Sequence, residues 1–114
     1  MPETAGLGSR PLQLLQVEES ERFRSNVGLV EVSGQPVTLE ISAVPPDGKI
    51  SAVTELTLRP NEFRQLGSLL KSLGLDGTYN ARVTVRVIEG EGRVTAYASV
   101  IDMQTNDPTY VPAQ

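Results

Sequence analysis

In the run Val37–Val44, VTLEISAV, apolar side chains at positions 37, 39, 41 and 43 alternate with polar ones at positions 38, 40 and 42. Successive side chains of a β-strand point to opposite faces, so this pattern is typical of a strand with one buried face. Similar apolar or alternating runs recur along the chain, separated by turns that contain Gly or Pro; they are residues 11–17, 23–32, 51–59, 62–66, 79–88 and 93–102. Such spacing predicts an all-β, antiparallel sandwich.

Two connections in this pattern have their own signature. Ser68 precedes a short leucine-rich stretch, residues 69–73, and Gly74 follows it, so we expect a brief helix with a Ser N-cap that covers one open end of the core. The runs Tyr79–Ile88 and Arg93–Asp102 are joined by Glu-Gly-Glu-Gly, which is the usual signal of a β-hairpin.

The two ends of the chain differ from the middle. Residues 1–10 are rich in small and polar residues, and we expect a flexible tail or linker there, followed by a single sandwich domain over residues 11–114. The segment Pro11–Val17, PLQLLQV, changes phase, which suggests a bulge. It is either the first strand of its own sandwich or a strand that pairs with the open edge of a second molecule.

Composition excludes most enzyme chemistry. The 114 residues contain no His and no Cys, so imidazole bases, Ser-His-Asp triads, thiolate nucleophiles and His- or Cys-ligated metals are impossible. The net charge of −4 disfavours nucleic acid as a partner. No run is long enough to insert into a membrane, and Met1–Arg10 lacks the apolar centre of a signal peptide. We therefore expect a protein without catalytic residues or cofactors.

Three segments together have the sequence pattern of a known kind of domain: FRSNVGLVEVSGQPVTLEISAVPPDGK, LRPNEFRQLGSLLKSLGL and GRVTAYASVIDMQTNDPTYVPAQ. They resemble an immunoglobulin-like β-sandwich repeat of bacterial secreted and cell-surface proteins, over Phe23 to Gln114. The chain departs from that repeat at Met103, where Asn is more usual. The resemblance implies a sandwich of about seven strands with one short helix. It also implies an extracellular, non-enzymatic module of a larger protein, which would serve structure, adhesion or protein–protein interaction.

The candidate ligand-binding residues are Tyr97 of the last long run and, in the loop Asp102–Tyr110 that follows, Asp102, Asn106, Asp107 and Tyr110. The side chains of Asp102, Asn106 and Asp107 could bind calcium through their oxygen atoms, but Asp and Asn also shape turns through hydrogen bonds to the backbone. The tyrosines could stack against a sugar, or they could pack on the sheet. The final residues, TYVPAQ, form either a short edge strand or an exit from the fold.

Other charged groups have a structural explanation as well as a functional one. The glutamates at positions 18, 19, 21, 89 and 91 could include a carboxylate pair for glycoside hydrolysis, but charged breaks and loop tips predict solvated side chains. Arg22, Arg24 and Arg64 could hold an acidic ligand, or they could pair with nearby carboxylates such as Glu62 and Asp102. We expect any partner to be a protein, or a second copy that pairs through an edge strand.

Overall fold

The structure, a computed structural model, describes residues 3–46, 52–73 and 81–114, and within them it has eight strands and one short helix. The strands are β1 (Leu12–Val17), β2 (Phe23–Glu31), β3 (Val37–Val44), β4 (Ala52–Leu58), β5 (Phe63–Gly67), β6 (Ala81–Gly90), β7 (Val94–Asp102) and β8 (Pro108–Pro112); the helix is α1 (Leu69–Ser72). Residue 51 of the predicted run 51–59, Gly74 after the predicted helix, and residues 79 and 80 of the predicted run 79–88 lie outside the described residues.

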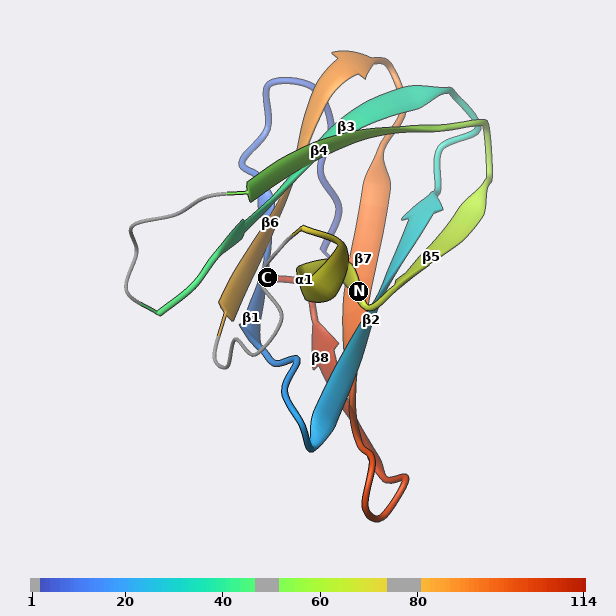
Figure 1. Ribbon diagram of the computed structural model, residues 1–114. Helices are drawn as coiled ribbons and strands as arrows, with labels where there is room; N and C mark the ends of the chain where they lie inside the picture. Colours follow the sequence, from blue (N-terminus) through green and yellow to red (C-terminus); the bar gives the residue numbers. More distant parts are fainter. Residues whose placement is uncertain (1–2, 47–51, 74–80) are drawn as a thin grey trace.

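The strands form two antiparallel sheets of four, arranged like a sandwich (Figure 1). The strand orders are β1-β6-β3-β4 and β5-β2-β7-β8. The prediction of an all-β sandwich with one short helix is confirmed, with eight strands in place of about seven. No described helix is long and apolar enough to cross a membrane.

Aliphatic side chains from the inner faces of both sheets make the core. In β3 the alternation is as expected, because Val37, Leu39, Ile41 and Ala43 are buried and the residues between them are not. Leu69 and Leu70 of α1 are buried against the same core, with Leu66 and Leu73 partly buried beside them. The helix therefore covers part of the core, as its leucine spacing predicts.

The predicted hairpin of residues 79–102 is wrong. β6 pairs with β1 and β3, whereas β7 pairs with β2 and β8, so the chain crosses from one sheet to the other between them. Gly90 has a φ of 96°, and a Cβ built on it would lie 2.5 Å from the carbonyl oxygen of Pro36. The glycine loop is needed for this close backbone approach. Alternation and loop length do not distinguish such a crossing from a hairpin.

The N-terminal segment is also different from the expectation of a flexible tail. Ala5 is buried and exchanges two backbone hydrogen bonds of 2.9 Å with Val94 of β7. β1 follows as a strand of its own sandwich, paired with β6, and its register shifts between Leu14 and Val17 as the phase change predicts. The first of the two alternatives for Pro11–Val17 is the one observed.

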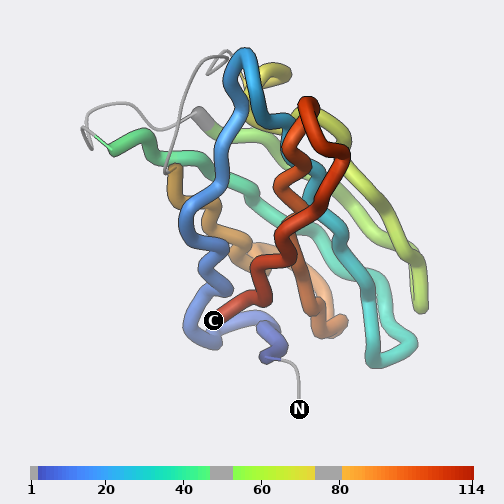
Figure 2. The backbone as a smooth tube through the Cα atoms, turned by 90° about the horizontal axis from the view of Figure 1, so that it is seen from below, coloured from blue at the N-terminus to red at the C-terminus, as the bar shows by residue number. Residues whose placement is uncertain are grey.

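The C-terminal segment closes the same side of the molecule. β8 pairs with β7 as an edge strand, so TYVPAQ does not simply leave the fold. Gln114 then exchanges two backbone hydrogen bonds of 2.9 Å with Gln13 of β1, which joins the two sheets along this side. Figure 2 shows the C-terminus beside the blue N-terminal part of the chain.

Candidate functional site

The predicted site residues divide between a turn and a sheet face. Asp102 ends β7, while Asn106 and Asp107 lie in the turn before β8. Tyr97 of β7 and Tyr110 of β8 lie together, with ring centroids 6.5 Å apart and an interplanar angle of 51°. The tyrosines and the turn therefore have different surroundings and different chemistry.

Asp102 is engaged within the protein. Its Oδ2 accepts a 2.8 Å hydrogen bond from Nη2 of Arg22, and its Oδ1 accepts one of 2.9 Å from the backbone N–H of Gln104. The Arg22 hydrogen bond and charge, with the Gln104 bond, lower the pKa of Asp102 below its ordinary value. The predicted ion pairing is confirmed for Arg22, and also for Arg64, whose Nη2 lies 2.8 Å from Oε2 of Glu62. Within the described residues, Arg24 makes no ion pair.

The rest of the turn is shaped by short-range hydrogen bonds. Asn106 adopts a φ of 63° and donates its backbone N–H to the carbonyl oxygen of Asp102. The N–H of Asp107 bonds to Oγ1 of Thr105 at 3.2 Å. In the described part of the chain, no group of three or more Asp or Glu side chains is placed to hold a metal ion. The observed role of these residues is to form the turn.

Tyr97 lies across the outer face of its sheet, over Gly28 of β2. A Cβ built on Gly28 would lie 2.1 Å from Cε1 of Tyr97, so only glycine leaves room for the ring. The group that approaches Gly28 is thus a side chain, and the pairing of β2 with β7 passes this position without a bulge. Tyr110 is 67% exposed beside it. The two rings form an aromatic surface that is tilted rather than flat.

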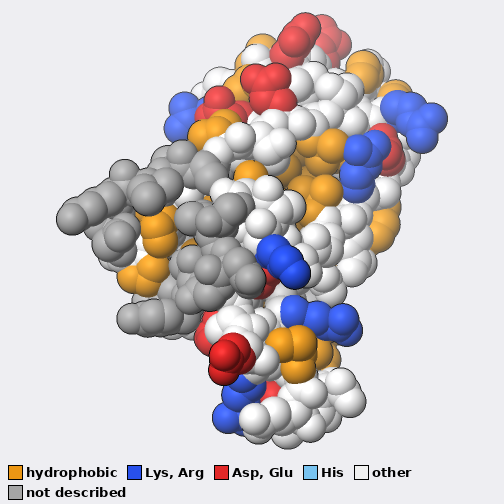
Figure 3. Space-filling model, viewed as in Figure 1, with side chains coloured by type: hydrophobic (Ala, Val, Ile, Leu, Met, Phe, Trp, Pro, Cys, Tyr) orange, Lys and Arg blue, Asp and Glu red, His pale blue; other side chains and the backbone are white. Residues whose placement is uncertain are grey.

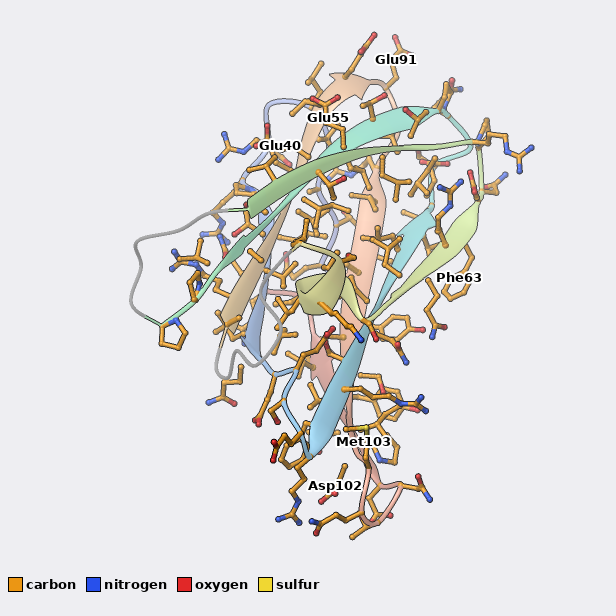
Figure 4. The ribbon with its side chains drawn as sticks, viewed as in Figure 1. Glu40, Glu55, Phe63, Glu91, Asp102 and Met103 are labelled. Atoms are coloured by element: carbon orange, nitrogen blue, oxygen red, sulfur yellow. The ribbon has the colours of Figure 1, made fainter. Side chains whose placement is uncertain are left out.

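This outer face of the β5-β2-β7-β8 sheet carries almost no charge. Strand pairing and alternation place its outward residues at positions 63, 65, 67, 24, 26, 28, 30, 95, 97, 99, 101, 108, 110 and 112. Arg24 is the one charged residue in that set. Phe63 is 53% exposed at the β5 edge, and Figure 4 shows it pointing away from the body of the molecule. We call this surface the aromatic face.

The outer face of the other sheet is different. It carries Glu40, Glu55, Arg82 and Arg86, with Glu40 beside both Glu55 and Arg86 across the strands. Figure 3 shows acidic side chains gathered over this part of the molecule, where Figure 4 labels the glutamates, and an apolar patch at the margin where Phe63 lies. A charged face is typical of a sheet that remains in water, so the aromatic face is the candidate binding surface.

The sequence analysis missed a buried carboxylate, Glu31, at the end of β2. It is 1% exposed and accepts six hydrogen bonds of 2.6–3.1 Å from residues 33–35, Asn61 and Arg93. Each of these donors lies in a connection that crosses between the two sheets. Glu31 thus joins three crossings at one end of the sandwich. Its inward position, in phase with Val27 and Leu29, is the one signal in the sequence that could have indicated burial.

Glu31 makes stability depend on pH. Burial opposes its charged form, but the hydrogen bonds from Ser33, Asn61 and Arg93 outweigh this and lower its pKa from 4.5 to about 2. A lowered pKa in the folded state contributes stability above pH 4.5, and this contribution is lost as the pH falls toward 2. We expect up to about 3 kcal/mol of unfolding free energy to be lost in that range. Urea unfolding at pH 6 and pH 3 measures it, and a Glu31→Gln variant should lose less on acidification; an equal loss in both proteins would contradict the assignment.

Glu19 is a second buried carboxylate, where the charged stretch 18–22 predicts solvated side chains. It is 3% exposed, and accepts hydrogen bonds from Oγ of Ser25 at 3.0 Å and from the N–H groups of Leu70 and Lys71 at 3.1 and 3.0 Å. Ser68 occupies the N-cap position with a φ of 52° but makes no side-chain capping bond. The prediction of a Ser cap is therefore wrong, because a distant carboxylate bonds the free N–H groups of the helix.

This geometry gives a matched pair of variants. We expect Glu19→Ala to destabilise the fold by about 1–3 kcal/mol, because it leaves buried donors without a partner. Ser68→Ala should cost less than about 0.5 kcal/mol, because no capping bond is lost. Chemical denaturation of both variants checks this, and a larger effect at Ser68 than at Glu19 would show that the capping assignment is incorrect.

The comparisons with known proteins concern the fold. No family model matches the chain, and no curated protein matches it. It is similar to a solved structure described as the crystal structure of Thermotoga maritima 1070, with a TM-score of 0.68 and 15% sequence identity, over 94% of this chain and 91% of that one. At this level of identity the likeness shows a shared sandwich-like arrangement and assigns no activity.

Proposed function

We propose that the chain is a non-catalytic interaction module of a bacterial surface or secreted protein, and that it contacts a protein partner through the aromatic face. The observation that carries the proposal is the contrast between the two outer faces. One carries both signs of charge, and the other exposes Phe63 and Tyr110 with Arg24 as its one charged residue. Protein interfaces are depleted of charge at their centre and enriched in aromatic residues.

The construction of the aromatic face suits a binding role. It lies on four paired strands, so its side chains are held on a rigid support rather than on loops. Tyr97 is fixed over Gly28, which reduces the entropy lost when a partner orders it. The resemblance to the immunoglobulin-like repeat supports the placement of the module outside the cell and the immunoglobulin-like assignment of the sandwich, both of which belong to this proposal.

A neutral glycan is a second candidate, and the exposed ring of Tyr110 beside Tyr97 favours it. An aromatic ring can stack on a sugar, although the 51° tilt limits the platform to one ring at a time. Calcium has no comparable support, since both carboxylate oxygens of Asp102 already accept hydrogen bonds, one of them from a guanidinium.

Binding of the fluorescently labelled chain to the cells of the bacterium that encodes it tests the proposal. We expect Tyr110→Glu to reduce binding at least tenfold, because it places a charge on the aromatic face, and Thr57→Glu on the other outer face to leave binding unchanged. Protease treatment of the cells should abolish binding. Loss on periodate oxidation alone would favour the glycan, and binding that is absent, or unchanged by Tyr110→Glu, would contradict the proposed surface.

A further inference from the structure

The four strands at the sheet edges are not equally available. β1 and β8 are joined to each other through Gln13 and Gln114, so the two edges on that side are covered along part of their length. In the described part of the chain, β4 and β5 each have a partner on one side only. Unpaired strand edges pair readily with another chain unless charges, prolines or bulges prevent it.

The free edge of β5 has a defined set of donors and acceptors. The backbone bonds Glu31 N–H to Glu62 oxygen and Ser68 N–H to Ser25 oxygen, both 2.9 Å, show that even-numbered residues of β5 face β2. Bonding direction alternates along an antiparallel strand. The N–H and C=O groups of Phe63, Gln65 and Gly67 therefore point away from the sheet. β5 has no Pro or Lys, its one charged side chain, Arg64, is paired with Glu62 at 2.8 Å, and its register with β2 is unbroken.

Gly67 has no evident reason within its own chain to be glycine. Its φ is not among the positive values, and a Cβ built on it would meet only Asn26 Oδ1, at 3.4 Å. A glycine in a strand often marks the close approach of another group. Two strands away on the same face, Tyr97 already covers Gly28 in this way. Phe63, four residues before Gly67 on the same edge, is 53% exposed and lies opposite Val30 of β2 rather than opposite a glycine.

We propose that two copies of this chain pair antiparallel through β5, about a two-fold axis at Gln65. In this register Gln65 lies opposite Gln65 of the second copy, and Phe63 lies opposite Gly67. The outward-pointing backbone groups then bond to one another, because residues 63, 65 and 67 all become hydrogen-bonded positions. Each Phe63 ring covers the Gly67 of the other copy, and the aromatic faces of the two copies join into one continuous face of an eight-stranded sheet.

The β4 edge fits a second copy less well. Its central outward residue is Glu55, flanked by Val53 and Thr57 on the same face. A two-fold pairing about the middle of β4 would place two Glu55 carboxylates opposite each other, which is destabilising. β5 has Gln at the equivalent place. The self-complementary edge is therefore β5.

Sedimentation equilibrium of the purified chain measures the association. A pairing of five residues buries less than a standard interface, so we expect a weak dimer with a dissociation constant on the order of 100 µM. Gly67→Ala should raise this constant at least tenfold, because the added methyl group occupies the place of the Phe63 ring. The melting temperature of Gly67→Ala at low protein concentration should not fall below that of the wild type, since the substitution leaves the monomer folded. A wild-type chain that stays monomeric at about 1 mM, well above that expected constant, or a Gly67→Ala dimer of unchanged affinity, would overturn the proposal.

Cysteine cross-linking tests the register, and the absence of natural cysteine makes it unambiguous. Cα atoms of a hydrogen-bonded antiparallel pair lie about 5.5 Å apart, within disulfide range. We expect Q65C to form a covalent dimer on mild oxidation, and T57C on β4 to do so much more slowly. F63C mixed with G67C should cross-link faster than either alone. Equal rates for Q65C and T57C would contradict the β5 pairing. Since only the purified chain is used, these results are independent of whether the aromatic face binds cells.

Discussion

Replacing Glu31 with alanine is expected to destabilise the protein by about 3–5 kcal/mol, a large part of the stability of a domain this size. The substitution removes the acceptor of six hydrogen bonds. It leaves the backbone N–H groups of residues 33–35 and of Asn61 without a partner, while the Arg93 N–H keeps a 3.1 Å bond to Oγ of Ser33. Each buried donor left unpaired has a desolvation cost. Urea unfolding monitored by circular dichroism measures the change in unfolding free energy.

Glu91→Ala is the matched control, because Glu91 is exposed near the same end of the sandwich. It should change the unfolding free energy by less than about 0.5 kcal/mol. Glu31→Gln should lie between the wild type and Glu31→Ala, since an amide can accept hydrogen bonds at one of its two positions only. If Glu31→Ala unfolds at the same urea concentration as Glu91→Ala, Glu31 does not join the three connections.

Gly90→Ala is expected to cost about 2–4 kcal/mol, the second largest effect. Gly90 has a φ of 96°, which side chains rarely adopt, and an added Cβ would lie 2.5 Å from the Pro36 carbonyl oxygen. Because the clash is with backbone, neither side of the contact can move without disturbing the crossing between β6 and β7. Thermal unfolding monitored by circular dichroism measures the loss.

Gly34→Ala separates the two causes of this effect. Gly34 has a similar φ of 83°, but a Cβ built on it would have nothing within 4 Å. It should therefore show the conformational cost alone, about 1 kcal/mol. Equal losses at Gly34 and Gly90 would mean that the close approach to Pro36 contributes nothing.

The strands were predictable because burial of one face leaves a local record in the sequence. β3 begins and ends at the predicted residues, and β7 ends at the predicted Asp102. Which strands pair with one another is not indicated by any local pattern in the sequence. Residues 79–102 have the alternation of a hairpin whether the second strand returns beside the first or crosses to the other sheet. Only the contact of Gly90 with the Pro36 backbone distinguishes these outcomes, and it joins residues far apart in the chain.

The candidate site was only partly predictable, because it too depends on how the strands pair. Tyr97 and Tyr110 were selected as residues near the last turn, and they do lie together. The aromatic face as a whole needs the registers of three strand pairs, which bring Phe63 and Gly28 onto the same surface. The buried carboxylates Glu19 and Glu31 were missed because most of their donors are backbone N–H groups, which no residue type in the sequence reveals.

Photo-cross-linking tests the central claim, that the chain binds a protein through its aromatic face. A photoreactive phenylalanine analogue replaces Tyr110 in one variant and Glu55, on the charged face, in the other, and both are irradiated in the organism that encodes the chain. We predict one discrete protein adduct from position 110, at least tenfold more abundant than any adduct from position 55. Equal adducts from both positions, or adducts from position 55 alone, would contradict the account.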